Sequence, residues 1–373
     1  MSLGLVAIVV LIALAFTYIN GFHDTANSIA TVVATKVLSP GQAVLLAAIT
    51  NMIGALWGTA VAATIAAGIV NTGVIDAGPQ LLICALLAAI VWNLLTWWLG
   101  LPSSSSHALV GALVGAAISA SGGRLEAVIW AQGAHWWAGK GVIPKVVVPM
   151  VVSPLLGFAL GFLLMGSLYA LLAWFASRKG VLRYLGRTPF VNSFFGKAQI
   201  VSASAMGLAH GMNDAQKSMG IIALALASAT AAGQFDGLPT WLTFLRIHES
   251  TAGGFAVPSW VAVVCALTMA GGTAGGGWRI IKTLGHKMVK LHPINGFAAE
   301  GSSALVILGA SMFGLPVSTT HVVSSSIMGV GAAKRFNAIR WSVVERMVWA
   351  WILTLPVTAM LAYGFVWIAQ HWF

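Results

Sequence analysis

Long apolar stretches follow one another along nearly the whole chain, with only short polar segments between them. A stretch of roughly 20 such residues crosses a hydrocarbon core of about 30 Å as an α-helix. A chain of 373 residues built in this way has room for on the order of ten to twelve crossings. We therefore expect an all-α, polytopic membrane protein. The apolar stretches lie at 3–38, 42–68, 81–99, 104–121, 144–175, 199–230, 255–275, 294–313, 317–333 and 348–368.

Two segments are expected to differ from a simple spanning helix. The stretch from Leu3 to Leu38 would be about 54 Å long as one helix at 1.5 Å per residue, well beyond the hydrocarbon core. A break or re-entrant turn is therefore expected near Gly21. The segment 125–143 contains three tryptophans, which favours a helix lying in the outer membrane interface.

The composition leaves the bilayer as the only fitting solvent. Hydrophobic residues make up 59% of the chain and charged residues only 7%, against roughly 25% charged residues in ordinary soluble domains. This excludes a water-soluble globular enzyme. The net charge of +11 would suit nucleic acid, but so apolar a chain offers no hydrated basic face along its length. We expect the lipid bilayer as a partner, no nucleic acid and no cofactor.

Two polar motifs occur twice along the chain. At an offset of 190 residues, GFHDTANSIA from Gly21 matches GMNDAQKSMG from Gly211, and Asp24 falls on Asp214. At an offset of 214 residues, LPSSSSH from Leu101 matches LPVSTTH from Leu315. Two pairs in the same order, each centred on polar residues that are rare in this chain, indicate an internal duplication.

The charges in matching loops indicate how the two halves are oriented. Short cytoplasmic loops collect Lys and Arg, and 13 of the 19 basic residues lie at 178–197, 279–290 and 334–346. The segments before the second copies of the motifs are basic. The matching segments in the first half carry no Lys or Arg. We therefore predict inverted-topology repeats, the architecture of secondary transporters, with the N-terminus and the C-terminus both outside the cell (inner) membrane.

This interpretation divides the chain into four parts. Residues 1–143 form the first inverted repeat, and residues 199–347 form the second. Residues 144–198 supply a linking helix and a basic cytoplasmic loop, and residues 348–373 form a C-terminal helix. Broken or re-entrant helices are expected in both repeats, because transporters of this kind place their binding sites at such breaks.

Asp24 and Asp214 are carboxylates within apolar sequence, where a charge costs roughly 2.5 to 3.5 kcal/mol at a helix centre. Helix capping is the alternative explanation for a single Asp after a Gly. Two such residues at equivalent places in inverted halves favour an ion-coupling site instead. Asn27 lies three residues after Asp24 on the same helix face and adds an oxygen ligand, so Asp24, Asn27 and Asp214 are the predicted Na⁺ ligands if the coupling ion is Na⁺.

The second motif contains a cluster of hydroxyl residues in each copy, Ser104 to Ser106 and Ser318 to Thr320. Each hydroxyl cluster follows a proline, which ends one helix before Ser or Thr begins the next. A helix N-terminus inside the membrane presents free backbone N–H groups, and hydroxyls add further donors. Two such ends suit a tetrahedral oxyanion, although Ser and Thr in membrane helices also bond to the backbone or pack closely. The predicted substrate-binding hydroxyls are Ser104, Ser105, Ser106, Ser318, Thr319 and Thr320.

Further charged and titratable residues lie close to these motifs in the sequence. Lys217 stands where the first repeat has Asn27, and it is expected to pair with Asp214, to contact the substrate, or to extend to the interface. Glu300 in another apolar stretch is a second candidate proton carrier, with a hydrogen-bonded structural acid as the alternative. His107 and His321 end the hydroxyl clusters and are expected to bond a neighbouring helix or to relay protons.

These motifs together closely resemble the inorganic phosphate transporter (Pit) family in its bacterial branch. The resemblance rests on GFHDTANSIATVVATKVLSP, GLPSSSSHALVGALVG, HGMNDAQKSMGII, GGWRIIKTLGHKMVKL and GLPVSTTHVVSSSIMGVGAAKR. It implies uptake of inorganic phosphate driven by H⁺ or Na⁺, a homodimer, and a substrate site between the repeats. The resemblance assigns ion coupling or substrate contact to Asp24, Asn27 and Asp214, and phosphate binding to the two hydroxyl clusters. Lys217 departs from the symmetric Asp-x-x-Asn arrangement of Na⁺-coupled members, which favours H⁺.

Three rival functions differ in what they require. An intramembrane hydrolase needs a third group to orient its Ser and His, and neither copy supplies one. A passive anion channel has no need of paired buried carboxylates. A permease for sulfate or another tetrahedral oxyanion stays open, because the hydroxyl donors recognise only tetrahedral oxygens.

Overall fold

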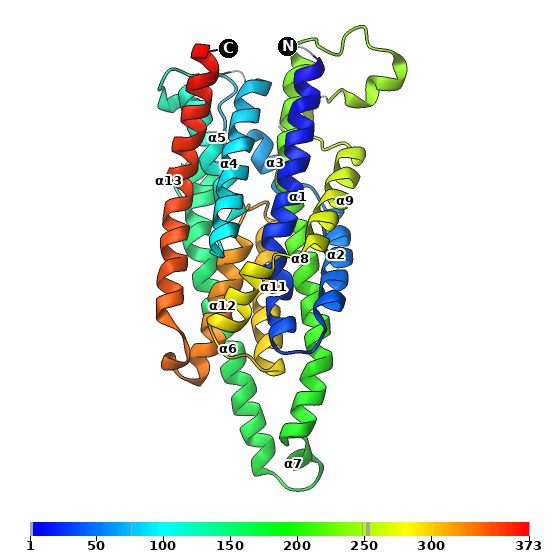
Figure 1. Cartoon of the computed structure of the whole chain (residues 1–373), viewed down its shortest axis with the longest axis vertical. Helices are drawn as coiled ribbons and strands as arrows, with labels where there is room; N and C mark the ends of the chain where they lie inside the picture. The colour runs from blue at the N-terminus through cyan, green and yellow to red at the C-terminus, as the bar shows by residue number, and fades with distance from the viewer. Residues whose placement is uncertain (1–2, 76, 248, 251–253, 373) are drawn as a thin grey trace.

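The computed structural model describes residues 3–75, 77–247, 249–250 and 254–372 as a bundle of helices along one long axis (Figure 1). The first half contains α1 (Leu3–Ala34), α2 (Pro40–Ala55), α3 (Ala60–Ala67), α4 (Pro79–Leu99) and α5 (Ser105–Ala120), then η1 (Leu125–Ala127), β1 (Gln132–His135), β2 (Ala138–Lys140) and η2 (Ile143–Val147). The linking region contains α6 (Val148–Ser177) and α7 (Val181–Leu185). The second half contains α8 (Thr188–Ala231), η3 (Thr240–Leu245), β3 (Glu249–Ser250), β4 (Gly254–Phe255), α9 (Ser259–Gly275), α10 (Trp278–Lys282), η4 (Thr283–Lys287), α11 (Pro293–Met312), α12 (Thr319–Lys334), η5 (Phe336–Ala338) and α13 (Trp341–Trp372).

The predicted all-α membrane architecture with broken helices is confirmed. By length and composition, four of the described helices can cross a membrane, or up to six if each bent pair counts as one span. The bent pairs are α2 with α3, at 69°, and α9 with α10 and η4, at 58°. The count of ten to twelve crossings stays a prediction, since α5 and α12 have only 16 residues each and α8 and α11 carry buried polar side chains.

The helices of the two halves run in opposite directions (Figure 1). α1 descends from the end of the molecule at which α13 finishes, whereas α8 rises from α7 at the other end. The α4–α5 and α11–α12 hairpins likewise enter from opposite ends. The halves are interlocked, because α5 packs along α13, α12 packs along α6, α1 packs along α9 and α8 packs along α2.

Glycines allow these helices to approach closely. A Cβ added at Gly115 of α5 would lie 1.9 Å from the carbonyl oxygen of Ala359 in α13. A Cβ added at Gly329 of α12 would lie 2.1 Å from the carbonyl oxygen of Phe158 in α6. The two glycines are 214 residues apart, the same offset as the hydroxyl motif, so the same packing solution occurs in both hairpins.

The turn inside each hairpin has the same local basis. α4 ends at Gly100 with φ 67°, and the α11–α12 turn contains Gly314 with φ 64°. Such positive φ values suit glycine because it has no Cβ. The hydroxyls of Ser104 and Ser318 then accept hydrogen bonds from the backbone N–H groups of the third residue of the next helix, at 3.2 Å each. Each serine is therefore an N-cap that starts its half-length helix.

Two expectations about local structure are wrong. α1 continues without a break through Gly21, because this glycine serves a close contact with α9: an added Cβ would lie 2.5 Å from the carbonyl oxygen of Met269. From Asn20 onwards α1 is almost entirely buried in protein, so the thickness of the lipid does not limit its length. The segment 125–143 is not an interfacial helix but contains the β1–β2 hairpin, which exposes Trp136 and Trp137.

Candidate functional site

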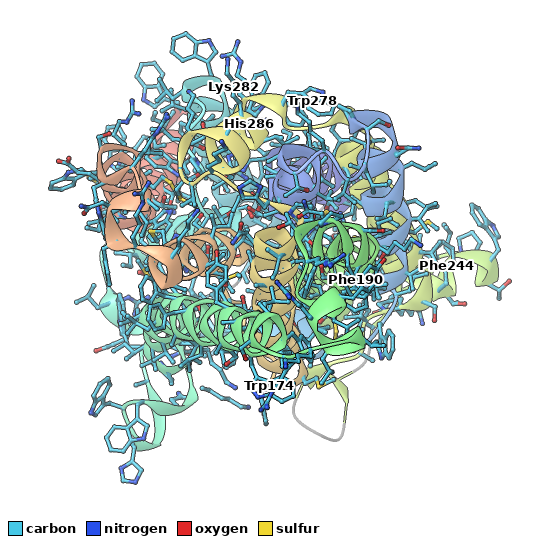
Figure 2. The ribbon with its side chains drawn as sticks, turned by 90° about the horizontal axis from the view of Figure 1, so that it is seen from below. Trp174, Phe190, Phe244, Trp278, Lys282 and His286 are labelled. Carbon is cyan, nitrogen blue, oxygen red and sulfur yellow. The ribbon has the colours of Figure 1, made fainter. Side chains whose placement is uncertain are left out.

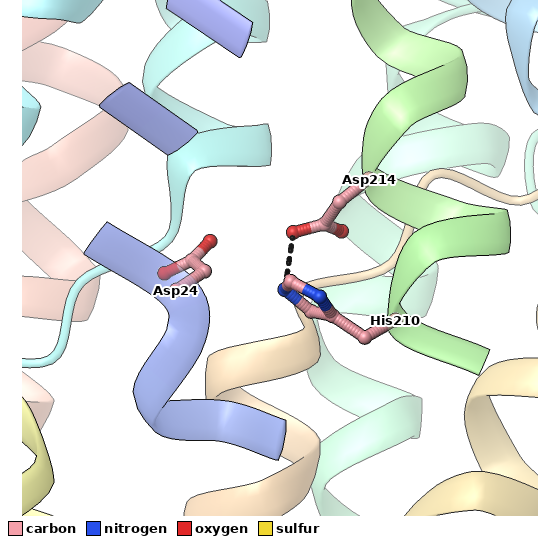
Figure 3. Close-up of side chains that lie close together, drawn as sticks. All are labelled: Asp24, His210 and Asp214. Carbon is pink, nitrogen blue, oxygen red and sulfur yellow. Dashed lines mark ion pairs between the residues drawn. The ribbon is translucent and has the colours of Figure 1, made fainter. Parts of the chain in front are cut away.

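The carboxylates of Asp24 and Asp214 face each other across the two antiparallel helices α1 and α8 (Figure 3). Both side chains are buried, at 2% and 0% exposure. The imidazole of His210 lies beside them, and one ligand-type atom from each of the three residues lies within 4.8 Å of the others. The duplicated motif therefore brings its two acids together in the core of the bundle.

Hydroxyl and imidazole groups surround Asp24. The Oγ of Ser105 donates to Oδ2 of Asp24 at 2.7 Å, and the Oγ1 of Thr320 donates to Oδ1 at 3.4 Å. The Nδ1 of His23 lies 2.8 Å from the same Oδ1, and its Nε2 faces the Oγ1 of Thr96 at 3.1 Å. No Lys or Arg of the described residues lies within salt-bridge distance of this carboxylate.

A fixed cation accompanies Asp214. The Nζ of Lys217 donates to Oδ1 of Asp214 at 2.6 Å, and both side chains are fully buried. The Nε2 of His210 lies 3.2 Å from Oδ2, while its Nδ1 faces the Oδ1 of Asn51. Of the three roles expected for Lys217, the pair with Asp214 is the one that the structure shows. Extension to the membrane interface is wrong, because the ammonium is buried beside a carboxylate that holds it there.

The hydroxyl clusters divide into two groups. Ser105, Thr319 and Thr320 reach the carboxylates, since the Oγ1 of Thr319 donates to Oδ2 of Asp214 at 3.3 Å. Ser106 donates to the carbonyl oxygen of Val317 at 3.1 Å, and Ser104 and Ser318 cap α5 and α12. The predicted residues thus converge, but only half of them face the acids.

Asn27 of α1 bonds to α12 at the site. Its Nδ2 donates to the Oγ1 atoms of Thr319 and Thr320, at 3.2 and 3.0 Å. Its Oδ1 has no hydrogen-bond partner among the described residues. The amide oxygen is therefore available to a cation or to another donor.

Glu300 forms a separate polar site. Its carboxylate accepts hydrogen bonds from Thr31, from the Nε2 of Gln199 at 3.1 Å and from the Oγ of Ser202 at 2.5 Å. Thr31 is seven residues after Asp24, or about 10 Å further along α1. The structure therefore does not join Glu300 directly to the paired aspartates.

Two histidines that face the acids were not predicted from the sequence. His23 adjoins Asp24, and His210 lies one helical turn before Asp214, a spacing that places two side chains on the same face. The predicted pair His107 and His321 instead meets ring to ring, with centroids 4.8 Å apart, and His321 also stacks on Trp351 at 4.1 Å. The i, i+4 spacing of His210 and Asp214 was the available signal.

Comparison with known proteins shows the family of this chain. The model of the phosphate transporter family PHO4 matches residues 20–362, which include both copies of each motif. The chain belongs to this family. It is accordingly a multi-pass membrane transporter and not an enzyme.

Curated relatives cover nearly all of the chain. A Bacillus subtilis protein named probable low-affinity inorganic phosphate transporter is 43% identical over 96% of this chain and 95% of its own length. A Rhizobium meliloti protein with the same name is 42% identical over 96% of this chain and 93% of its own length. A solved structure named "The sodium-dependent phosphate transporter" has a TM-score of 0.79 over the whole of both chains at 23% identity, which shows the shared fold.

Proposed function

We propose that this transporter takes up inorganic phosphate together with a cation, and that both bind where α1, α5, α8 and α12 meet. The observation that carries the proposal is the convergence of hydroxyls from the first turns of α5 and α12 on two buried carboxylates. The names of the relatives support phosphate as the substrate. The proposed phosphate ligands are Ser104, Ser105, Ser106, Ser318, Thr319, Thr320 and Lys217.

The charges at this site support coupling to a cation. Asp24 and Asp214 contribute two negative charges and Lys217 one positive charge, while phosphate near neutral pH adds about one to two more negative charges. Two like charges 4 Å apart repel by about 4 kcal/mol at an effective dielectric constant of about 20. A bound cation removes this repulsion, which a passive anion channel would leave uncompensated.

We favour H⁺ over Na⁺ as the coupling ion. The buried ammonium of Lys217 already supplies a positive charge beside Asp214, where a Na⁺ site would use an oxygen ligand. A proton on Asp24 would then neutralise the carboxylate that lacks a fixed countercharge. Na⁺ coupling is the alternative, with Asp24, Asn27 and Asp214 as ligands, and the sodium dependence named for the solved structure with the same fold favours it.

Three further features belong to this proposal. The opposed helix directions and the matched contacts of Gly115 and Gly329 support inverted repeats with the predicted boundaries. The start of α1 and the finish of α13 lie at the same end of the molecule, opposite the basic α6–α7–α8 turn. This supports placing both termini on the outer side of the inner membrane. Assembly as a homodimer rests on the family resemblance alone.

The direct test is accumulation of labelled phosphate by proteoliposomes containing the purified protein. Uphill accumulation supports a transporter, whereas uptake that stops at equal concentrations would indicate a channel. Excess unlabelled sulfate should compete weakly, and competition equal to that of phosphate would favour a general oxyanion permease. Asp236→Asn is a suitable control for the site aspartates, because Asp236 is 80% exposed and lies in the loop after α8.

A further inference from the structure

A polar cavity lies away from the paired aspartates, at the end of the molecule that carries the α6–α7–α8 turn. It encloses about 580 Å³ between the end of α1, η4, the start of α11 and the segment that joins α12 to α13. Figure 2 views this end and shows His286 on the η4 ribbon. The volume falls within the range of about 300 to 1,000 Å³ that is usual for small-molecule sites.

All charged residues in the lining of this cavity are basic. Lys290, Lys334, Arg335 and Arg340 line it together with His286 and His292, and no Asp or Glu does. In the described part of the chain, none of the four Lys and Arg side chains lies within 4 Å of a carboxylate oxygen. Four positive charges thus surround one hollow without internal neutralisation, which is a binding arrangement for a polyvalent anion.

Packed backbone fixes the two segments that carry the basic residues, whose own side chains are exposed. The backbone N–H of Arg340 donates to the carbonyl oxygen of Met288 at 3.1 Å and ties the α12–α13 connection to the segment after η4. Gly331 packs so closely on Val289 that an added Cβ would lie 3.0 Å from a methyl group of that valine. The lining cations therefore project from two segments that are fixed against each other.

Membrane topology alone accounts for basic residues on this side but not for their convergence on a hollow. The other basic segment, at 178–197, carries four of its five charges on the exposed turn around α7 and the fifth, Lys197, on α8. The hydrophobic hollow near that turn is lined by leucine, valine and phenylalanine side chains only. The first-half positions equivalent to Lys334, Arg335 and Arg340 are Ala120, Ser121 and Glu126, so the duplication does not account for the cluster either.

We propose that this cavity binds a soluble anion that carries two or more phosphoryl groups. A single phosphate ion would contact only part of a lining with four cations, whereas a chain of phosphoryl groups reaches several at once. Ala34, also in the lining, lies ten residues after Asp24, or about 15 Å along α1, so the cavity is separate from the transport site. A ligand that ties η4 to the α12–α13 connection would restrain the segments on either side of the α11–α12 hairpin. It would in this way regulate transport.

Calorimetric titration of tripolyphosphate into the protein tests this inference. The protein is held in nanodiscs of phosphatidylcholine at fixed ionic strength and fixed orthophosphate concentration. We expect saturable binding, with Kd raised about tenfold or more in Lys290→Gln/Arg340→Gln and in Lys334→Gln/Arg335→Gln. The matched control Arg183→Gln/Arg187→Gln removes two charges from the α7 turn and should bind as the wild type does. Phosphate uptake into proteoliposomes that contain each variant, measured without tripolyphosphate, checks that the variant is folded.

Other results would overturn the proposal. Equal affinity in the cavity variants and the control would place binding elsewhere, and absence of saturable binding to the wild type would remove the site. A second titration uses nanodiscs that contain phosphatidylglycerol, and we expect the same affinity there. Loss of binding in those nanodiscs would assign the cavity to a lipid headgroup instead of a soluble anion. None of these titrations depends on whether the paired aspartates couple phosphate to a cation.

Discussion

Asp24 and Asp214 occupy equivalent places in the two halves, yet their surroundings differ in charge. Asp24 is held by hydroxyls and by His23, whereas Asp214 is held by the ammonium of Lys217 and by His210. The two copies of the motif therefore position two similar carboxylates, and residue differences nearby place a Lys ammonium beside only one of them. In the proposed mechanism, the protein balances the charge of Asp214 and a transported cation balances the charge of Asp24.

Replacing either aspartate should give the largest effect on transport. We expect Asp24→Asn and Asp214→Asn each to abolish concentrative uptake in proteoliposomes, because the first removes the carboxylate proposed to take up the coupling cation and the second removes the countercharge of Lys217 at the same site. Only Asp214→Asn should also destabilise the fold, by about 3 to 5 kcal/mol, because it leaves the buried Lys217 unpaired. Thermal unfolding in detergent measures this second effect.

The double variant Asp214→Asn/Lys217→Met separates the two roles of this pair. It should recover most of the lost stability and none of the uptake. If Asp24→Asn were as unstable as Asp214→Asn, the two carboxylates would not differ in charge compensation. Wild-type uptake by either single variant would remove that aspartate from the mechanism, provided that Asp236→Asn also transports normally.

Loss of one hydroxyl should have a smaller effect, and a different one in each half. Ser105→Ala and Thr319→Ala each remove a donor to a charged group, worth about 1.5 to 3 kcal/mol, so KM for phosphate should rise about 10- to 100-fold. Ser105→Ala should also disturb Asp24 more than Thr319→Ala disturbs Asp214, because the bond from Ser105 to Asp24 is 2.7 Å long while the bond from Thr319 to Asp214 is 3.3 Å long. Initial uptake rates over a range of phosphate concentrations give both values. An unchanged KM in both variants would favour a packing role for these hydroxyls.

The packing of the α4–α5 and α11–α12 hairpins should be equally sensitive to an added methyl group. In this the packing differs from the surroundings of the two aspartates, which are unequal in charge. Gly115→Ala and Gly329→Ala each force a methyl group into the backbone of a neighbouring helix, at a cost of about 1 to 3 kcal/mol. Similar drops in the temperature of unfolding are expected for both. Gly166→Ala and Gly364→Ala are the controls, because no atom within 4 Å would meet the added Cβ. Strongly unequal drops would contradict an equivalent packing of α5 and α12.

Glu300→Gln should have the smallest effect on uptake. Thr31, Gln199 and Ser202 already satisfy this carboxylate, and the neutral amide retains most of these contacts. We expect uptake to slow by less than about tenfold and still to respond to the same ion gradient. Complete loss of uptake, equal to that of Asp24→Asn, would promote Glu300 from a second proton carrier to an essential one.

The sequence predicted the helical class, the presence of broken helices and the residues at the centre, since these follow from hydrophobic length, from proline and from rare polar groups. The turn geometry was also accessible, because Gly-Leu-Pro before Ser or Thr encodes a helix end followed by a helix start. The position of Gly21 was misjudged because a glycine in a helix has the same sequence appearance whether it breaks the helix or admits a neighbour.

Partner choice inside the site was less predictable. The sequence gives no distance between α5 and α1, so it could not distinguish Ser105, which reaches Asp24, from Ser106, which bonds to a backbone carbonyl. The β1–β2 hairpin was missed because tryptophans favour the membrane interface in helices and in hairpins alike.

Ion-driven uptake into proteoliposomes tests the central claim most directly. Phosphate accumulation is measured with an inward pH gradient in the absence of Na⁺, then with a Na⁺ gradient at equal pH, for the wild type and for Lys217→Asn. The account predicts that the pH gradient alone drives the wild type and that Lys217→Asn is impaired, because Asp214 loses its fixed countercharge. Strict dependence on the Na⁺ gradient, with no response to the pH gradient, would contradict it and leave Lys217 as a phosphate ligand only.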